Sequence, residues 1–234
     1  VKGMLTALDG GVYQLETGLR NKDEQRTLKA FDQIKTMSDK IKKMVLEILY
    51  YAKSRDHQFR QIRIKDFLKN VMGSIQPMAK KNKVTLELEG YFAGTMELDP
   101  SWMESALVNF LENAIEACSF DQKKTDHHVC FTVSEESSGM IRFVIKDNGM
   151  GMDQETREKM FTLFFTSKGS QGTGLGMFIA NRVIKQHGGS VEVTSEPDLG
   201  TTMIIRLPRF QELSQDPAND FPIDPGHKGL KNPA

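Results

Sequence analysis

The chain has 234 residues, and its 31 lysines and arginines balance its 31 aspartates and glutamates, so the formal net charge at pH 7 is zero. This balance gives no support for binding to nucleic acid or to a membrane surface, and no apolar run reaches the roughly 18 residues that a membrane-spanning helix needs. Two cysteines, Cys118 and Cys130, are too few for a disulfide framework and are typical of a protein from a reducing compartment.

The first 57 residues carry two runs of apolar side chains that alternate between spacings of three and four. The runs are Leu5, Leu8, Val12, Leu15 and Leu19, and then Ile34, Met37, Ile41, Met44, Ile48 and Tyr51. Heptad spacing places one apolar seam along each helix, and the polar break at residues 20–23 predicts an antiparallel hairpin. Because one hairpin cannot bury these seams, we predict a homodimer with a four-helix bundle. The alternative is a hairpin that docks on its own C-terminal domain.

Three further features of this region bear on its organisation. Gly10 and Gly11 lie inside the first predicted helix, where a glycine costs about 1 kcal/mol relative to alanine. The pair fits either a close approach of two helices or a kink. Residues 54–61 lose the heptad, so we place a linker there and interpret His57 as a solvated linker residue. The chain starts at Val1 inside a periodic pattern and has no initiator methionine, so we expect a fragment of a longer protein.

Residues 62–210 alternate between helical and strand patterns, which predicts one mixed α/β domain. Strands are predicted at residues 59–64, 84–88, 95–98, 129–134, 140–146, 191–193 and 202–207, and helices at residues 65–81, 99–115, 153–163 and 175–186. We expect an α/β sandwich in which helices cover one mixed, mostly antiparallel sheet. Residues 211–234 are rich in proline, aspartate, asparagine and glycine, and their low apolar content predicts a disordered tail.

Two asparagines mark the helix predicted at residues 99–115. Asn109 and Asn113 lie four residues apart, so their amides share one face of the helix with Glu116, while Glu112 lies beside Asn113. An amide oxygen is a neutral, hard ligand suited to Mg²⁺, which also keeps waters and phosphate oxygens. A hydrogen-bonded pair of asparagines is the alternative. The glycine loops that follow favour the ligand role.

The first glycine loop begins with an acidic residue at the end of a predicted strand. Asp147 precedes Gly149 and Gly151, and glycines let the backbone approach a flat ring without interference from a Cβ atom. A carboxylate at this point can accept a hydrogen bond from an exocyclic amine, which adenine has and guanine replaces with an oxygen. The alternative is an Asp-Asn-Gly turn of a hairpin.

A second glycine loop immediately precedes the last predicted helix. Gly172, Gly174 and Gly176 leave backbone amides at a helix N-terminus unobstructed, which favours phosphate binding. The spacing is neither a Walker loop nor a dinucleotide fingerprint. Lys168 can reach a terminal phosphate as a point charge. We expect residues 153–173 to form a lid over the nucleotide. Phe161, Phe164 and Phe165 then serve as its apolar hinge contacts or simply as core residues.

These motifs, in this order, resemble those of sensor histidine kinases, within the superfamily that includes gyrases, heat-shock ATPases and mismatch-repair proteins. The matching segments are residues 109–114 (N box), 147–151 (G1 box), 161–168 (F box) and 172–176 (G2 box). The resemblance implies a Bergerat-type ATP-binding domain at residues 62–210. Residues 1–57 resemble the family's dimerisation and phosphotransfer hairpin.

The resemblance also implies a role for each matching residue. Asn113 is expected to be the Mg²⁺ ligand, Asn109 to support it near the phosphates, and Asp147 to bind the adenine amine. Catalytic roles are expected for Asn109, Glu112 and Lys168. The implied nucleotide-binding residues are Asn109, Asn113, Asp147, Gly149, Gly151, Phe161, Phe165, Thr166, Lys168, Gly172, Thr173, Gly174, Leu175 and Gly176.

The N-terminus departs from the family pattern. Family members phosphorylate a histidine in a His-Glu/Asp-Leu-Arg-Thr/Asn-Pro-Leu-Thr segment, and residues 1–6 fit only its tail, which places the acceptor two residues before Val1. We expect a fragment cut just after the acceptor; the alternative is a degenerate segment with no acceptor. Gly3 replaces the residue that positions water in the family's phosphatase reaction, which argues against that activity, and Met4 replaces the proline.

The function expected from this resemblance is that of a protein-histidine kinase. The chain is expected to bind ATP and Mg²⁺, to transfer the γ-phosphoryl group to a histidine, and to pass it to an aspartate of a response-regulator receiver domain. We expect a cytoplasmic homodimer, or the cytoplasmic part of a longer sensor, that contacts neither nucleic acid nor membrane. The alternatives are a non-catalytic, dimeric nucleotide-sensing scaffold and another ATPase or serine kinase of the superfamily.

Overall fold

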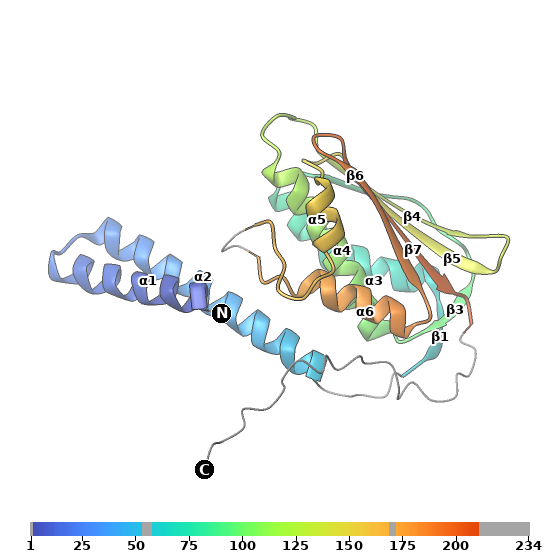
Figure 1. The fold of residues 1–234 in the computed structure, drawn as a ribbon, viewed down its shortest axis with the longest axis horizontal. Coiled ribbons are helices and arrows are strands. Elements are labelled where there is room, and N and C mark those ends of the chain that lie inside the picture. Colours follow the sequence, from blue (N-terminus) through green and yellow to red (C-terminus); the bar gives the residue numbers. More distant parts are fainter. Residues whose placement is uncertain (1, 53–57, 169–171, 211–234) are drawn as a thin grey trace, which may run out of the picture.

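Figure 1 shows the computed structural model, which describes residues 2–52, 58–168 and 172–210. It consists of an N-terminal helical hairpin and an α/β domain. His57 of the predicted linker and the predicted tail at residues 211–234 lie outside the described residues. Within the described segments, we find no helix with the length and hydropathy needed to cross a membrane.

The hairpin consists of α1 (Lys2–Arg20) and α2 (Glu24–Ala52), joined at the polar break that the sequence indicated. Glycines bring the two helices together. A Cβ atom on Gly11 would lie 3.0 Å from Cγ1 of Ile34, and one on Gly18 would lie 2.7 Å from Oγ1 of Thr27. Of the two interpretations of the glycine pair, Gly11 therefore serves a close approach, whereas no described residue comes within 4 Å of a Cβ atom placed on Gly10.

The buried and exposed apolar positions of the hairpin form two separate stripes. Its inner contact contains Met4, Gly11 and Gly18 of α1 and Ala30, Met37 and Met44 of α2, each set spaced by seven residues. The outer stripe remains exposed and contains Leu5, Val12, Leu19, Leu28 and Phe31. Met4 and Met44 also belong to the same buried cluster as the α/β domain, so one end of the hairpin touches that domain.

The α/β domain is built on a five-stranded sheet with the order β2-β4-β5-β7-β6. Its strands are β2 (Thr85–Gly90), β4 (His128–Glu135), β5 (Met140–Asp147), β6 (Ser190–Glu196) and β7 (Gly200–Pro208). The β2–β4 pair is parallel and the other three pairs are antiparallel, which confirms the mixed, mostly antiparallel sheet. A separate antiparallel pair joins β1 (Arg60–Arg63) to β3 (Thr95–Leu98).

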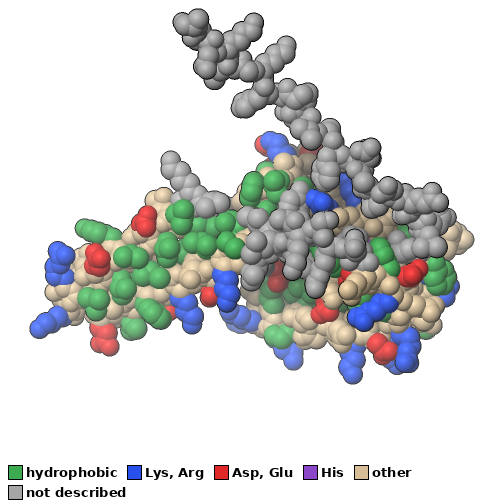
Figure 2. Space-filling model, turned by 90° about the horizontal axis from the view of Figure 1, so that it is seen from below, with side chains coloured by type: hydrophobic (Ala, Val, Ile, Leu, Met, Phe, Trp, Pro, Cys, Tyr) green, Lys and Arg blue, Asp and Glu red, His purple; other side chains and the backbone are tan. Residues whose placement is uncertain are grey.

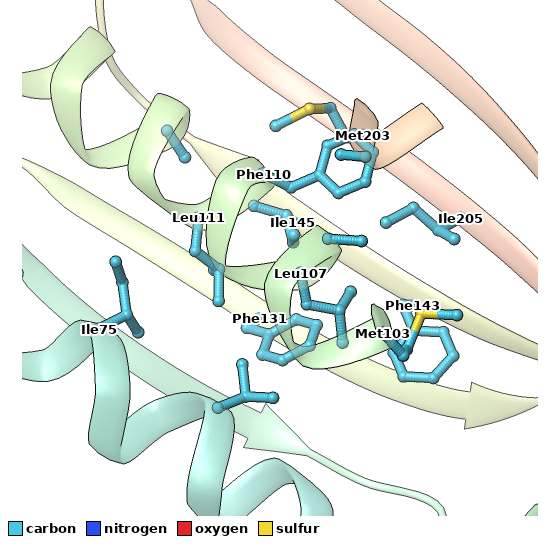
Figure 3. Close-up of a cluster of buried hydrophobic side chains, with 14 of the residues drawn as sticks. Ile75, Met103, Leu107, Phe110, Leu111, Phe131, Phe143, Ile145, Met203 and Ile205 are labelled. Atoms are coloured by element: carbon cyan, nitrogen blue, oxygen red, sulfur yellow. The ribbon is translucent and has the colours of Figure 1, made fainter. Parts of the chain in front are cut away.

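Helices α3 (Ile64–Lys81), α4 (Pro100–Phe120) and α6 (Gly176–Gln186) lie together on one face of this sheet (Figure 1). Asp99 begins α4 by accepting hydrogen bonds from the amides of Ser101 and Trp102, as a helix cap does. Figure 3 shows the resulting core, a buried cluster to which α4 contributes Leu107 and Phe110 and the sheet contributes Phe131 and Phe143. Helix α4 is therefore fixed on the sheet by one side, and its other side is available to the site.

One predicted helix is shorter in the structure. The pattern predicted a helix over residues 153–163, but α5 spans only Gln154–Lys159. Asp153 caps its start by accepting a hydrogen bond from the amide of Thr156. The chain then leaves the helix through turns, in which the amide of Thr162 bonds the carbonyl of Lys159 and Phe164 adopts a φ of +64°. A bond between residues three apart closes a tight turn and does not continue the four-residue bonding of an α-helix, so the helix ends before residue 163.

Candidate nucleotide-binding site

A cavity of about 780 Å³ opens beside α4 and is lined by residues from all four sequence motifs. The predicted site residues that line it are Asn109, Glu112, Asn113, Asp147, Gly151, Phe165, Thr166, Lys168, Gly172, Thr173, Gly174 and Gly176. Gly149, Phe161 and Leu175 are not among its lining residues. Leu175 is buried in the core, and Phe161 packs against the core. The predicted lid includes residues 169–171, which lie outside the described residues.

The adenine end predicted from the sequence is a buried carboxylate. The side chain of Asp147 is 2% exposed, and its Oδ1 accepts a hydrogen bond from the amide of Gly149 at 2.9 Å. Its Oδ2 is buried and has no hydrogen-bond partner among the residues that the structure describes. Burial raises the pKa of this carboxyl group to about 6, although the amides of Gly149 and Thr201 and the charge of Lys124 act in the opposite direction. An unpaired buried acceptor calls for a donor, and an exocyclic amine would supply one.

Glycines hold the loop after Asp147 tightly against its neighbours. A Cβ atom on Gly149 would lie 2.5 Å from the backbone carbon of Ala117 in α4, so this glycine permits packing on the helix. The amide of Met150 donates to the carbonyl of Ala117 at 3.1 Å. Gly151 has a φ of +66°, and its Cβ atom would lie 2.0 Å from the carbonyl oxygen of Glu196. The sequence interpretation assigned both glycines to ring access. In the structure each also meets a close backbone neighbour.

A lysine that the sequence analysis did not select supports the same loop. The ammonium of Lys124 donates to the carbonyls of Asn148 at 2.7 Å and Gly149 at 3.1 Å, and it pairs with Asp121 at 3.0 Å. Lys124 lies in a polar connection without a recognisable motif, so no pattern pointed to it. It holds in place the loop that the sequence analysis expected to bind adenine.

The other end of the cavity is formed by α4 itself. The side-chain amide nitrogen of Asn109 donates to the carbonyl of Ser105 at 3.0 Å, and that of Asn113 donates to the carbonyl of Asn109 at 2.9 Å. Each amide nitrogen is thereby bound to its own helix, which leaves the oxygen of each side chain as the group presented to other partners. This is the arrangement that a hard cation or a donor group requires.

Lys168 lines the cavity, and in this structure its side chain is bound to α4. Its ammonium donates to Oδ1 of Asn113 at 2.7 Å and forms an ion pair with the carboxylate of Glu116. The backbone amide of Lys168 is bound to Oγ1 of Thr166 at 3.1 Å. The cation expected to hold phosphates therefore occupies the position expected for a metal ion. Glu116 was recognised on this face of α4, but its pairing with Lys168 was not foreseen.

The second glycine loop leads into α6. Leu175, at the start of α6, provides no side-chain cap, and amides at a helix N-terminus favour anionic ligands. Gly176 brings the backbone close to α4, because a Cβ atom there would lie 2.8 Å from Oδ1 of Asn109. Lys40 of α2 also lines the cavity and was not selected from the sequence, since its place in a helical hairpin gave no sign of it.

A family model described as "Histidine kinase-, DNA gyrase B-, and HSP90-like ATPase" matches residues 98–211. This part of the chain belongs to that ATPase superfamily. The match begins at the end of β3 and includes both glycine loops and the asparagines of α4. The ATPase domain accordingly has the Bergerat-type fold that the sequence resemblance implied.

Curated relatives of the ATPase domain and its hairpin carry the same kinase name. Signal transduction histidine-protein kinase AtoS of Escherichia coli is 28% identical over 210 residues, which cover 89% of this chain and 33% of AtoS. Sensor histidine kinase ZraS of Escherichia coli is 24% identical over 172 residues, which cover 73% of this chain and 36% of ZraS. The chain thus spans about a third of the length of these two relatives.

Solved structures share the fold of both parts. The histidine kinase ThkA, solved in complex with the response regulator protein TrrA, superposes with a TM-score of 0.71 at 22% identity, covering 89% of this chain and 58% of that one. The Acinetobacter baumannii histidine kinase AdeS superposes with a TM-score of 0.67 at 17% identity, covering 89% of this chain and 96% of that one. The arrangement of a helical hairpin followed by an ATPase domain is therefore a known one.

Proposed function

We propose that the chain is the dimerisation and ATP-binding core of a sensor histidine kinase, with a hairpin at residues 1–57, an ATPase domain at residues 62–210 and a tail at residues 211–234. The observation that carries this proposal is the buried, unpaired Oδ2 of Asp147 in a cavity whose other end presents Asn113 and the amides of α6. A nucleotide such as ATP has an amine that can pair with Asp147 and phosphates that can meet Asn113 and the amides of α6.

The chain's own groups divide the work of binding. Asp147 accepts a hydrogen bond from the adenine amine, and the first amides of α6 hold phosphate oxygens together with the loop at residues 172–176. The oxygens of Asn113 and Glu116 are hard donors of the kind that Mg²⁺ prefers, and they already surround an ammonium group. Bound Mg²⁺ would neutralise part of the phosphate charge.

The reaction that these groups would support is phosphoryl transfer from ATP. The bond between the γ-phosphorus and the bridging oxygen of ADP breaks, and a bond forms between that phosphorus and an imidazole nitrogen. The imidazole proton passes to a carboxylate, for which we propose Glu112, a half-buried residue that lines the cavity. The phosphoryl group then moves from nitrogen to a carboxylate oxygen of an aspartate on a response regulator.

The acceptor histidine is the element on which the kinase reaction depends. Residues 1–56 contain no histidine. We therefore expect the 234-residue chain to bind ATP without labelling its hairpin. We propose that the acceptor stands just before Val1, where the family pattern places it.

We further propose that two copies associate through the outer stripe of the hairpin, defined by Leu5, Val12, Leu19, Leu28 and Phe31. Figure 2 shows hydrophobic side chains gathered along the hairpin. An uncovered apolar surface on paired helices is typical of a subunit interface. The inner contact of each hairpin is built from small and flexible side chains, so the larger apolar groups remain for a partner.

Two measurements test the proposed function. Calorimetric titration with ATP should show one nucleotide bound per chain, and radiolabelled ATP should leave the 234-residue chain unlabelled on histidine. A chain extended upstream of Val1 should become labelled and should pass the label to a response regulator. Histidine labelling of the 234-residue chain would refute the acceptor assignment. ATP binding without labelling of the extended chain would instead favour the nucleotide-sensing scaffold.

A further inference from the structure

The ammonium of Lys168 joins two oxygens that both belong to α4. Oδ1 of Asn113 lies 2.7 Å from it, and the carboxylate of Glu116 forms an ion pair with it. The side chains of Lys168 and Glu116 are 23% and 38% exposed, so this contact lies within the wall of the cavity. Lys168 reaches α4 from a segment more than fifty residues later in the sequence.

The amide of Asn113 has only one oxygen to offer. Its nitrogen donates to the carbonyl of Asn109 at 2.9 Å, so the amide group is held in one orientation. An oxygen that accepts a hydrogen bond from the Lys168 ammonium cannot at the same time bind a metal ion along the same direction. Two cations at one position would also repel each other strongly in a partly buried site.

We propose that Asn113 and Glu116 form a single cation site, that the Lys168 ammonium fills it when no metal is bound, and that Mg²⁺ arriving with a nucleotide displaces this ammonium. The proposal deepens the proposed function and rests on it. It makes Glu116 a metal-binding residue, a role that the family resemblance gave to Asn113 alone. An amide oxygen and a carboxylate oxygen together are a typical partial ligand set for Mg²⁺, which completes its shell with water and phosphate oxygens.

Displacement changes the partner of Lys168 while its backbone stays in place. The backbone amide remains bound to Thr166, so the released side chain moves from α4 toward the phosphates. The sequence interpretation of Lys168 as a phosphate contact and its observed pairing with α4 are then two states of one residue. Metal binding and the release of this lysine become one event.

The test uses the 234-residue chain and ADP, which lacks the γ-phosphate that Lys168 is expected to contact. Calorimetric affinities for ADP are measured with and without Mg²⁺, and their ratio gives the enhancement due to the metal. Glu116→Gln should lower this enhancement about tenfold or more, because it removes a charged ligand. Lys168→Met should raise it several-fold, because the competing cation is lost. The variant that combines both changes should bind metal more weakly than Lys168→Met alone.

A matched control removes a lysine from an ion pair outside the cavity. Lys159 pairs with Glu155 at 2.8 Å on α5, and neither residue lines the cavity. Lys159→Met should leave the metal enhancement unchanged. Binding of Mn²⁺ in the presence of ADP, followed by electron paramagnetic resonance, provides a second reading of the same ranking of variants. Circular dichroism checks that each variant is folded.

The possible outcomes separate the two proposals. If wild-type protein binds no ADP at all, the proposed function itself fails. If wild-type protein binds ADP but Glu116→Gln keeps the full metal enhancement, Glu116 is only an ion-pair partner and the cation site is refuted. If Lys168→Met weakens ADP equally with and without Mg²⁺, the lysine serves phosphates alone and the displacement is refuted.

Discussion

Replacing Asp147 with asparagine should stabilise the nucleotide-free protein at neutral pH and, at the same time, weaken its binding of adenine nucleotides. Burial raises the pKa of this carboxyl group from 3.8 to about 6. The folded protein therefore holds the proton more tightly than the unfolded chain does. As the pH rises from about 4 to about 6, the unfolded chain ionises first, so stability falls across this range and the full cost remains above it.

The size of the effect follows from the shift in pKa. At about 1.36 kcal/mol per pKa unit, ionising Asp147 costs the folded protein up to about 3 kcal/mol at pH 7.5. Asparagine removes this cost, but its amide nitrogen brings a donor to a position where Oδ2 has no partner among the described residues. An unpaired buried donor costs about 1–3 kcal/mol. We expect a net gain of about 1 kcal/mol at pH 7.5 and a net loss of about 1–2 kcal/mol at pH 4, where the wild type no longer carries the cost of ionisation but the asparagine still carries the cost of its donor.

Urea unfolding of the wild type and Asp147→Asn at pH 4, 5 and 7.5 measures the difference, and calorimetry with ADP at pH 7.5 measures binding. Asp66→Asn is the control, because Asp66 forms an exposed ion pair with Arg63 on the surface and should contribute little. The reasoning is refuted if Asp147→Asn loses stability at pH 7.5, or if it retains the pH dependence of the wild type between pH 4 and 6.

Three other substitutions test the remaining features. Lys124→Met should weaken ADP binding and cost about 1–3 kcal/mol of stability, because two loop carbonyls lose their donor. Lys123→Met, which breaks an exposed ion pair with Asp198, is the control. Equal behaviour of the two variants would contradict the positioning role of Lys124. Gly151→Ala should cost more stability in urea unfolding than Gly139→Ala. Both glycines have a positive φ, but of the two only Gly151 lies against a backbone oxygen, that of Glu196. Similar losses in the two variants would argue against the close contact of Gly151 with Glu196. Val12→Glu should convert the proposed dimer to a monomer in light scattering, whereas Gln14→Glu on the same helix should not, and a monomeric wild type would refute the proposed dimer.

Much of the fold could be predicted from periodicity, because the apolar patterns of the helices and strands coincide with buried faces. The hairpin shows the limit of this reasoning. The heptad pattern selected Leu5, Val12 and Leu19, whereas the contact within the hairpin is made one position earlier by Met4, Gly11 and Gly18. A search for apolar side chains does not select glycine, although here the lack of a side chain at Gly11 and Gly18 allows α1 and α2 to approach each other.

The candidate site shows a similar division. Glycine loops and paired asparagines are local patterns, so the sequence indicated most of the residues that line the cavity. Lys124 and Glu116 act through contacts with residues distant in the chain, at Asn148 and Lys168. The sequence around a single charged residue does not indicate which distant residue it will contact. The length of α5 was also misjudged, because the turn that follows it, in which the amide of Thr162 bonds the carbonyl of Lys159, leaves no mark in the pattern of apolar and polar side chains.

The contact of the first glycine loop with the backbone of Ala117 affects the dimensions of the site. Ala117 lies one helical turn after Asn113. The backbone that supports the loop at Gly149 and the side chain of Asn113 at the other end of the cavity therefore belong to the same helix. A helix rises about 1.5 Å per residue and is nearly rigid over one turn. In the proposed nucleotide complex, helix α4 therefore fixes the distance between the end of the site that takes the base and the end that takes the phosphates.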